Sequence, residues 1–299
     1  MTTFMETPVT FGVAPERARS WLLVPATQPE AFASAAASEV DAVILDIEDA
    51  VAPHAKPAAR DAVVAWLEAG NSAWVRINDA TTPFWADDLE ALSGLRGLAG
   101  IMLAKTESGG QVDATAARVT AGTRILALVE SAVGLEATPE IARADSTFRL
   151  AFGSGDFRRD TGMSDEPLAM AYPRSRLVVS SRAARLPGPI DGPTLTANDS
   201  ILARDSALTV SMGMTGKLCM HAEQAPIVNR VLAPAPGDVT WADEVIDTLG
   251  IDGAHVKDGS DLPRLAKALK IREAAGIFGI TAENNPAHIS SSPTGLGRE

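Results

Sequence analysis

Two acidic residues, Glu130 and Asp156, are the best candidates in this chain for binding a metal ion. Each follows an apolar run, Ile125–Val129 for Glu130 and Phe148–Phe152 for Asp156. Two carboxylates, with water and substrate oxygens in the remaining positions, are how proteins usually hold Mg²⁺. No cluster of His and Cys competes for a softer metal such as zinc. Either acid alone could equally be a helix cap or a salt-bridge partner, but the pair favours a metal site.

Other charged residues follow apolar runs in the same way. The residues that come directly after such runs are Asp46, Glu48 and Asp49 after Ala42–Leu45, Arg76 after Ala73–Val75, and Lys105 after Ile101–Ala104. Because charges are costly to bury, this pattern predicts buried strands that open into a polar site. Barrels and open α/β sheets place their chemistry at the C-terminal ends of strands. The pattern therefore predicts an enzyme.

Two arginines and one glycine could contact a ligand. Arg76 could bind a carboxylate through two parallel hydrogen bonds, or it could form a structural ion pair with Asp46 or Glu48. Arg19, just before Trp21–Pro25, has the same two interpretations. Gly155 could let the backbone approach a ligand, although its surroundings lack the spacing of a Walker or dinucleotide-binding loop.

The elements that must position these residues alternate between strand-like and helix-like runs. Strands are expected near 21–25, 42–46, 73–78, 100–105, 124–130, 149–152, 189–192 and 217–221, and helices over 28–38, 56–69, 108–121 and 172–186. Eight βα units in about 250 residues match a TIM (β/α)₈ barrel better than an open sheet. The fold class expected is α/β, with a C-terminal helical extension.

Four segments are expected along the 299 residues: an N-terminal tail at 1–16, a catalytic barrel at 17–233, a helical segment at 234–276 and a disordered tail at 277–299. A net charge of −12 argues against binding to nucleic acid. No apolar stretch approaches the roughly 18 residues that a membrane span needs. With one cysteine, Cys219, and no signal-peptide pattern at the start, a cytoplasmic location is expected.

Six motifs in order resemble the citrate lyase beta-subunit family, which includes the malyl-CoA and citramalyl-CoA lyases. They are Arg19–Pro25, Leu45–Val51 with Lys56 and Arg60, Val75–Asn78, Leu128–Leu135, Phe152–Asp156, and Gly216–His221 with Gln224. The resemblance covers about residues 19 to 275. Ala26, Ala104 and Ala222 depart from the common pattern, which leaves the identity of the substrate open.

The resemblance implies a homotrimeric or hexameric barrel that cleaves or forms a carbon–carbon bond beside a thioester. Its substrate would be a 3-hydroxyacyl-CoA such as malyl-CoA or citramalyl-CoA, and its products a 2-oxo acid and an acyl-CoA. It implies that Glu130 and Asp156 bind Mg²⁺ and that Arg76 binds the carboxylate of the oxo acid. The residues expected to contact the substrate are Arg19, Asp46, Arg76, Lys105 and Gly155.

Three acidic residues are candidates for the general base that removes the hydroxyl proton. Some family members use an aspartate in a C-terminal segment that reaches a neighbouring subunit's site. The stretch Asp258–Pro263 resembles that segment but is shorter, so Asp261 is one candidate. Glu48 and Asp49 are the others.

Three other functions compete with an acyl-CoA lyase. A beta subunit could act on a substrate carried by an acyl carrier protein. A metal-dependent 4-hydroxy-2-oxo acid aldolase is disfavoured. Such relatives resemble Asp-x-Glu-His at the end of the second strand, whereas the fourth residue of the corresponding stretch here is Asp49. A non-catalytic barrel is disfavoured because Arg76, Glu130 and Asp156 are all present.

Overall fold

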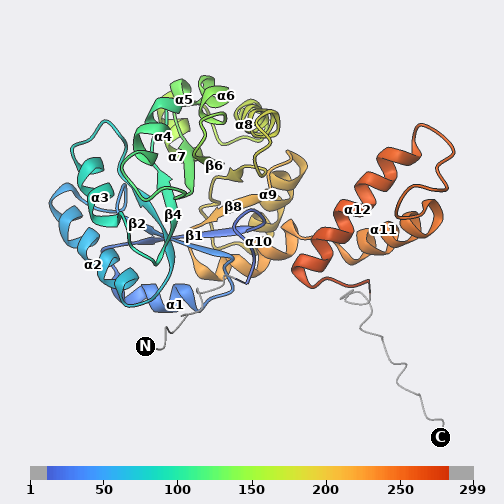
Figure 1. Ribbon diagram of the computed structural model, residues 1–299, viewed down its shortest axis with the longest axis horizontal. Helices are drawn as coiled ribbons and strands as arrows, with labels where there is room; N and C mark the ends of the chain where they lie inside the picture. Colours follow the sequence, from blue (N-terminus) through green and yellow to red (C-terminus); the bar gives the residue numbers. More distant parts are fainter. Residues whose placement is uncertain (1–11, 283–299) are drawn as a thin grey trace, which may run out of the picture. The chain divides into compact units, whose positions relative to one another are not determined.

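Eight parallel strands close into a barrel in chain order, from β1 next to β2 through to β8 next to β1 (Figure 1). The computed structural model describes residues 12–282. The strands are β1 Ser20–Pro25, β2 Ala42–Asp46, β3 Ala73–Ile77, β4 Leu98–Leu103, β5 Ile125–Val129, β6 Thr147–Phe152, β7 Ile190–Asp191 and β8 Gly216–Cys219. The predicted TIM-type barrel is confirmed.

Helices surround the barrel and connect its strands. They are α1 Phe32–Ala36, α2 Lys56–Glu68, α3 Phe84–Leu92, α4 Gly109–Ala116, α5 Ala132–Glu136, α6 Thr138–Ile141, α7 Ser154–Thr161, α8 Ala171–Ala183, α9 Asp199–Ser211 and α10 Ala225–Leu232. Two predicted helices are shorter than expected. The segment 28–38 begins with the 3₁₀ turn Pro29–Ala31, and the segment 108–121 is helical only from Gly109 to Ala116, with Ser108 as its cap.

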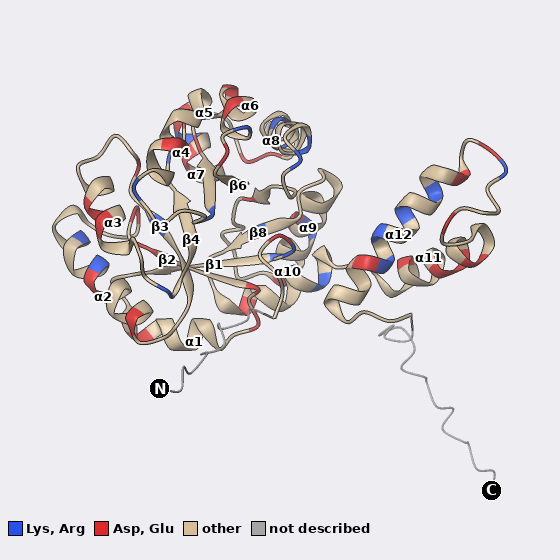
Figure 2. Cartoon of the chain, in the orientation of Figure 1, with Lys and Arg blue, Asp and Glu red and all other residues tan. Residues whose placement is uncertain are grey.

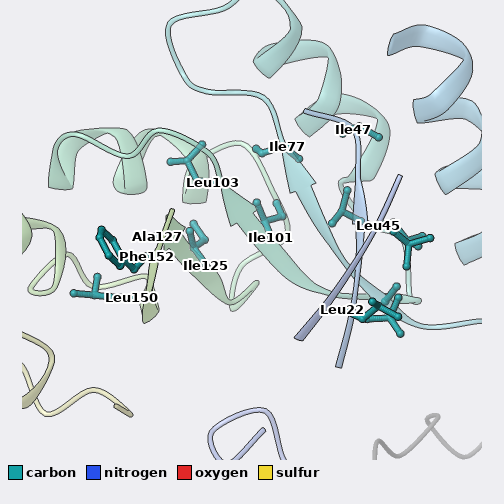
Figure 3. Close-up of a cluster of buried hydrophobic side chains, with 14 of the residues drawn as sticks. Leu22, Leu45, Ile47, Ile77, Ile101, Leu103, Ile125, Ala127, Leu150 and Phe152 are labelled. Carbon is teal, nitrogen blue, oxygen red and sulfur yellow. The ribbon is translucent and has the colours of Figure 1, made fainter. Parts of the chain in front are cut away.

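Successive side chains of each strand alternate between the barrel interior and the surrounding helices. The outward set, which includes Leu45 and Ile101, packs beneath the helices (Figure 3). The inward set forms a separate cluster in which Trp21 of β1 meets Trp74 of β3, with ring centroids 5.3 Å apart. Because β1 and β3 are not neighbours, this contact crosses the interior.

The same alternation decides which functional side chains can point inward. Ile44, Trp74 and Leu128 belong to the interior cluster. Two residues further along each strand lie Asp46, Arg76 and Glu130. The period of two therefore directs these three charged side chains into the barrel at the C-terminal ends of β2, β3 and β5.

Helices α11 (Pro236–Leu249) and α12 (Asp261–Phe278) form a second unit, which begins at Ala233 and packs α11 against α12. Acidic residues mark α11, whereas Lys and Arg recur along α12 (Figure 2). The helical segment reaches Phe278, two residues beyond its predicted end. Most of the predicted tail 277–299, from 283 onward, and residues 1–11 of the predicted N-terminal tail lie outside the described residues. Between residues 12 and 282 there is no helix with the length and apolar character of a membrane span.

Candidate active site

Seven of the predicted site residues meet at the C-terminal end of the barrel through a chain of ion pairs and hydrogen bonds. They come from the ends of β2 to β5 and from the first turn of α7: Asp46, Glu48, Asp49, Arg76, Lys105, Glu130 and Asp156. The side chains of opposite charge alternate in this chain of contacts. The site is therefore a mixed cluster rather than a patch of one sign.

Arg76 and Asp46 form a buried ion pair with two hydrogen bonds. Arg76 Nε lies 2.8 Å from Asp46 Oδ1, and its Nη2 lies 2.6 Å from Oδ2. Burial on its own would lower the pKa of Arg76, but the Asp46 carboxylate outweighs it and the pKa is raised. The structural ion pair that the sequence allowed is thus present. The remaining nitrogen, Nη1, lies 3.5 Å from Glu48 Oε2.

Lys105 joins the two halves of the cluster. Its backbone has a φ of 46°, in the left-handed region that a lysine rarely adopts. Its N–H donates to Glu130 Oε1 at 2.8 Å, while its Nζ contacts Glu48 and lies 3.2 Å from Asp49 and 3.6 Å from Asp156. Burial opposes the charge, but the hydrogen bond to Glu48 raises the pKa of Lys105. The lysine is therefore a fixed cation among these acids.

Glu130 and Asp156 have properties that fit a hard divalent cation. Glu130 is 4% exposed, and burial raises the pKa of its carboxyl to about 8. Asp156 Oδ2 is buried and accepts no hydrogen bond, although Arg159 Nη2 lies 3.0 Å away. Among residues 12–282, no three His, Cys, Asp or Glu side chains form a cage. Two carboxylates that leave positions for water and substrate suit Mg²⁺ better than a softer metal.

Gly153 makes room for the Glu130 carboxylate. A Cβ added at Gly153 would lie 2.3 Å from Glu130 Oε2, whereas one added at Gly155 meets nothing within 4 Å. Gly153→Ala is therefore expected to displace the carboxylate and weaken Mg²⁺ binding by roughly 10- to 100-fold. Gly155→Ala should leave Mg²⁺ affinity unchanged. Isothermal titration of both variants checks this, and equal affinities would contradict the packing argument.

The two candidate bases on the loop after β2, Glu48 and Asp49, differ in burial and in how many of their carboxylate oxygens have partners. Glu48 is buried, and burial raises the pKa of its carboxyl despite the opposing effect of Arg76. Its Oε2 accepts from the Asp49 N–H at 2.8 Å, and its Oε1 binds Lys105. The Asp49 side chain is 44% exposed, and although burial opposes it, the hydrogen bond with Glu48 lowers its pKa. Asp49 is thus the freer anion.

Arg19 does not lie at this site, which corrects the expectation that it contacts substrate. It precedes β1, and so lies at the N-terminal end of the barrel. Its Nε and backbone N–H both lie 2.8 Å from Asp41 Oδ2, and its Nη1 donates to the Asn229 carbonyl at 3.2 Å. The structural interpretation of Arg19 is therefore the right one.

Asp261 has a structural role within the second unit. Its Oδ2 accepts the N–H groups of Lys257 at 2.9 Å and Asp258 at 3.4 Å, and its Oδ1 lies 3.3 Å from Arg264. The carboxylate thus holds the turn that leads into α12. The expected role of Asp261 as a general base belongs to a neighbouring subunit's site and stays a prediction.

Two further residues, Arg159 and Asp88, contact the site or its loops and were not predicted from the sequence. Arg159, one turn after Asp156 on α7, pairs with that carboxylate. Asp88 on α3 is fully buried and binds the side chain of Asn78, which follows β3. An acid on the apolar face of an amphipathic helix was the available signal for Asp88.

Comparison with known proteins agrees with the motifs. Residues 19–222 match the HpcH/HpaI aldolase/citrate lyase family, and residues 237–279 match the HpcH/HpaI aldolase C-terminal domain. The citrate lyase subunit beta-like protein of Mycobacterium tuberculosis is 35% identical over 271 residues, covering 86% of this chain and 95% of that protein. The mitochondrial citramalyl-CoA lyase of Homo sapiens is 30% identical over 284 residues, covering 84% and 83%.

A solved structure of protein CitE from Mycobacterium tuberculosis, in complex with magnesium, acetoacetate and coenzyme A, superposes with a TM-score of 0.73. It is 31% identical, and the match covers 87% of this chain and 99% of that one. The complex of CitE with magnesium and pyruvate gives a TM-score of 0.67 at 30% identity, covering 86% and 100%. Fold, sequence and both matched segments agree that the chain belongs to the HpcH/HpaI aldolase/citrate lyase family.

Proposed function

We propose that this lyase uses Mg²⁺ to cleave, or in reverse to form, a 3-hydroxyacyl-CoA thioester such as malyl-CoA or citramalyl-CoA. The products of cleavage are a 2-oxo acid and an acyl-CoA. The observation that carries the proposal is the pair Glu130 and Asp156, both in contact with Lys105 at the C-terminal end of the barrel. Relatives named malyl-CoA and citramalyl-CoA lyase, and the magnesium complexes of CitE, support it.

The cluster can supply each group that this reaction needs. Bound Mg²⁺ lowers the pKa of the 3-hydroxyl and stabilises negative charge on the oxygens of the oxo acid. Asp49 or Glu48 takes the hydroxyl proton. The bond between C2 and C3 then breaks, its electron pair passes to the thioester as an enolate, and protonation at C2 gives the acyl-CoA. The Nη1 of Arg76, which lies 3.5 Å from Glu48 Oε2, and the ammonium of Lys105 supply positive charge for the carboxylate and the enolate.

The proton on Glu130 competes with Mg²⁺. Since burial raises the pKa of this carboxyl to about 8, binding below pH 8 must expel a proton. Affinity is therefore expected to fall about tenfold for each pH unit below 8, and to level off above it. Titration calorimetry at about pH 7, in buffers of different ionisation enthalpy, should detect release of about one proton. An affinity that does not change between about pH 6 and 8 would contradict the account.

An assay with competing substrates tests the proposal against its rivals. Purified protein with Mg²⁺ is given malyl-CoA and citramalyl-CoA, the corresponding acyl carrier protein esters, and free 4-hydroxy-2-oxo acids. Release of oxo acid from the CoA esters supports the proposal. Release only from carrier-bound esters favours a citrate lyase beta subunit, and release only from free acids favours an aldolase. No turnover with any of them, together with no Mg²⁺-dependent rise in melting temperature, favours a non-catalytic barrel.

The proposal includes assembly and location. We expect a homotrimer or hexamer, as the family resemblance implies, and a cytoplasmic location, as the single cysteine indicates. Light scattering coupled to size-exclusion chromatography measures the assembly, and a monomeric mass would contradict that part.

A further inference from the structure

Lys56, the first residue of α2, is a buried lysine for which the proposed chemistry has no direct use. It is 7% exposed, and within residues 12–282 it makes no ion pair with a carboxylate. Its Nζ instead donates to two successive backbone carbonyls, that of Ile47 at 3.1 Å and that of Glu48 at 2.9 Å. The same nitrogen lies over the Phe84 ring, 5.4 Å from its centroid. The ammonium is thus directed at the loop that follows β2.

These bonds fix both peptide groups of Glu48. Its N–H donates to Asp46 Oδ1 at 2.9 Å, and its carbonyl accepts from Lys56. With the backbone held on both sides, the direction of the Cα–Cβ bond of Glu48 is set, and the contacts with Lys105 and the Asp49 N–H select the rotamer. That side chain binds Lys105 and the backbone N–H of Asp49, so the position of the whole acidic loop depends on it.

One helical turn after Lys56, α2 holds the neighbouring loop as well. Arg60 Nε donates to Asp88 Oδ1 at 2.9 Å, and Asp88 Oδ2 accepts from the Asn78 side chain at 2.7 Å. Asn78 in turn lies 3.3 Å from the Ile47 carbonyl. Residues four apart share one face of a helix, so a single face of α2 braces the loops after β2 and β3.

We infer that Lys56 is a positioning residue, which holds the Glu48–Asp49 loop in register with Lys105 through the carbonyls of Ile47 and Glu48. Burial of a cation without a carboxylate partner is costly, and here the hydrogen bonds to the carbonyls of Ile47 and Glu48 offset that cost. The cost is consistent with a need for a donor at this place. The inference rests on the proposed function only for its effect on turnover.

Lys56→Met tests the inference, because it keeps an unbranched side chain only one atom shorter and removes the donors. Hydrogen–deuterium exchange of the backbone amides should be faster in the segment 46–51 than in wild type. It should remain unchanged in the barrel strands β4 and β5. With malyl-CoA or citramalyl-CoA, whichever the wild type cleaves, kcat should fall at least about tenfold while KM changes less than threefold. Lys56→Gln, which keeps an N–H donor, should lie between wild type and Lys56→Met in both measurements.

Leu67→Ala is the matched control, since Leu67 is buried about three turns further along the same helix, beside Gly97. It should lower the melting temperature but leave exchange in 46–51 and kcat as in wild type. If Lys56→Met does not fold, Lys56→Gln decides the question. Unchanged exchange in 46–51 for a folded Lys56 variant overturns the inference, even if the lyase activity stands. Raised exchange with no activity in the wild type would support the positioning role and overturn the proposed function.

Discussion

Turnover is expected to fall roughly 10³-fold or more when Glu130 is replaced by glutamine. The amide oxygen can still accept the Lys105 N–H, so the left-handed turn at Lys105 keeps its bond to this side chain. What is lost is the negative charge that a hard cation requires. Asp156→Asn should act in the same way, because it also removes a negative charge from the proposed metal site, together with the ion pair to Arg159. Coupled detection of oxo acid measures the loss of turnover.

Mg²⁺ binding separates this effect from misfolding. Wild-type protein should gain melting temperature with added Mg²⁺, whereas Glu130→Gln and Asp156→Asn should melt at a temperature that Mg²⁺ does not change. Asp160→Asn, on the same helix as Asp156, is the control and should keep the Mg²⁺ response. Full Mg²⁺ affinity with full turnover in either acid variant would show that the metal site has been placed wrongly.

Removing the Arg76 side chain should affect stability as well as activity. Arg76→Ala leaves Asp46 as a buried carboxylate without its partner, which typically costs about 3–5 kcal/mol of the free energy of unfolding. Turnover should be lost too, because Nη1 is the group proposed to bind the carboxylate of the oxo acid. Urea unfolding and the oxo acid assay measure the two effects.

A double variant separates the two roles of Arg76. Replacing a buried ion pair by apolar residues of similar volume is often neutral for stability. Arg76→Met with Asp46→Leu is therefore expected to recover part of the stability lost in Arg76→Ala, since the Glu48 N–H then lacks its acceptor, and to stay inactive. Recovery of turnover in the double variant would show that Arg76 serves only the ion pair.

The fold could be predicted from sequence because the barrel follows from the alternation of strand-like and helix-like runs along the chain. β2 has the expected bounds, Ala42–Asp46, and the inward alternation that ends in Asp46, Arg76 and Glu130 can be read from the chain. β7, Ile190–Asp191, is two residues shorter than the predicted 189–192. Backbone pairing with β6 and β8 forms this strand, and too few residues are involved to give a pattern.

The site was predictable only in part, since contacts between distant residues leave no local pattern. Arg19 shows the error most clearly: a charge before a strand lies at the opposite end of the barrel from a charge after it. For Asp261, the turn that its carboxylate holds depends on backbone N–H groups, which every sequence has. The left-handed backbone of Lys105 has no signal in a non-glycine residue. The bonds from Lys56 depend on the packing of α2 and could not be derived from the motif alone.

The most direct test of the central claim is the release of oxo acid from malyl-CoA and citramalyl-CoA, followed with Mg²⁺, after EDTA, and after Mg²⁺ is restored. Wild-type protein should release glyoxylate or pyruvate with Mg²⁺, stop with EDTA and recover when Mg²⁺ returns, while Glu130→Gln stays inactive throughout. Release that persists in EDTA, or that Glu130→Gln retains, would contradict a Mg²⁺ lyase centred on Glu130 and Asp156.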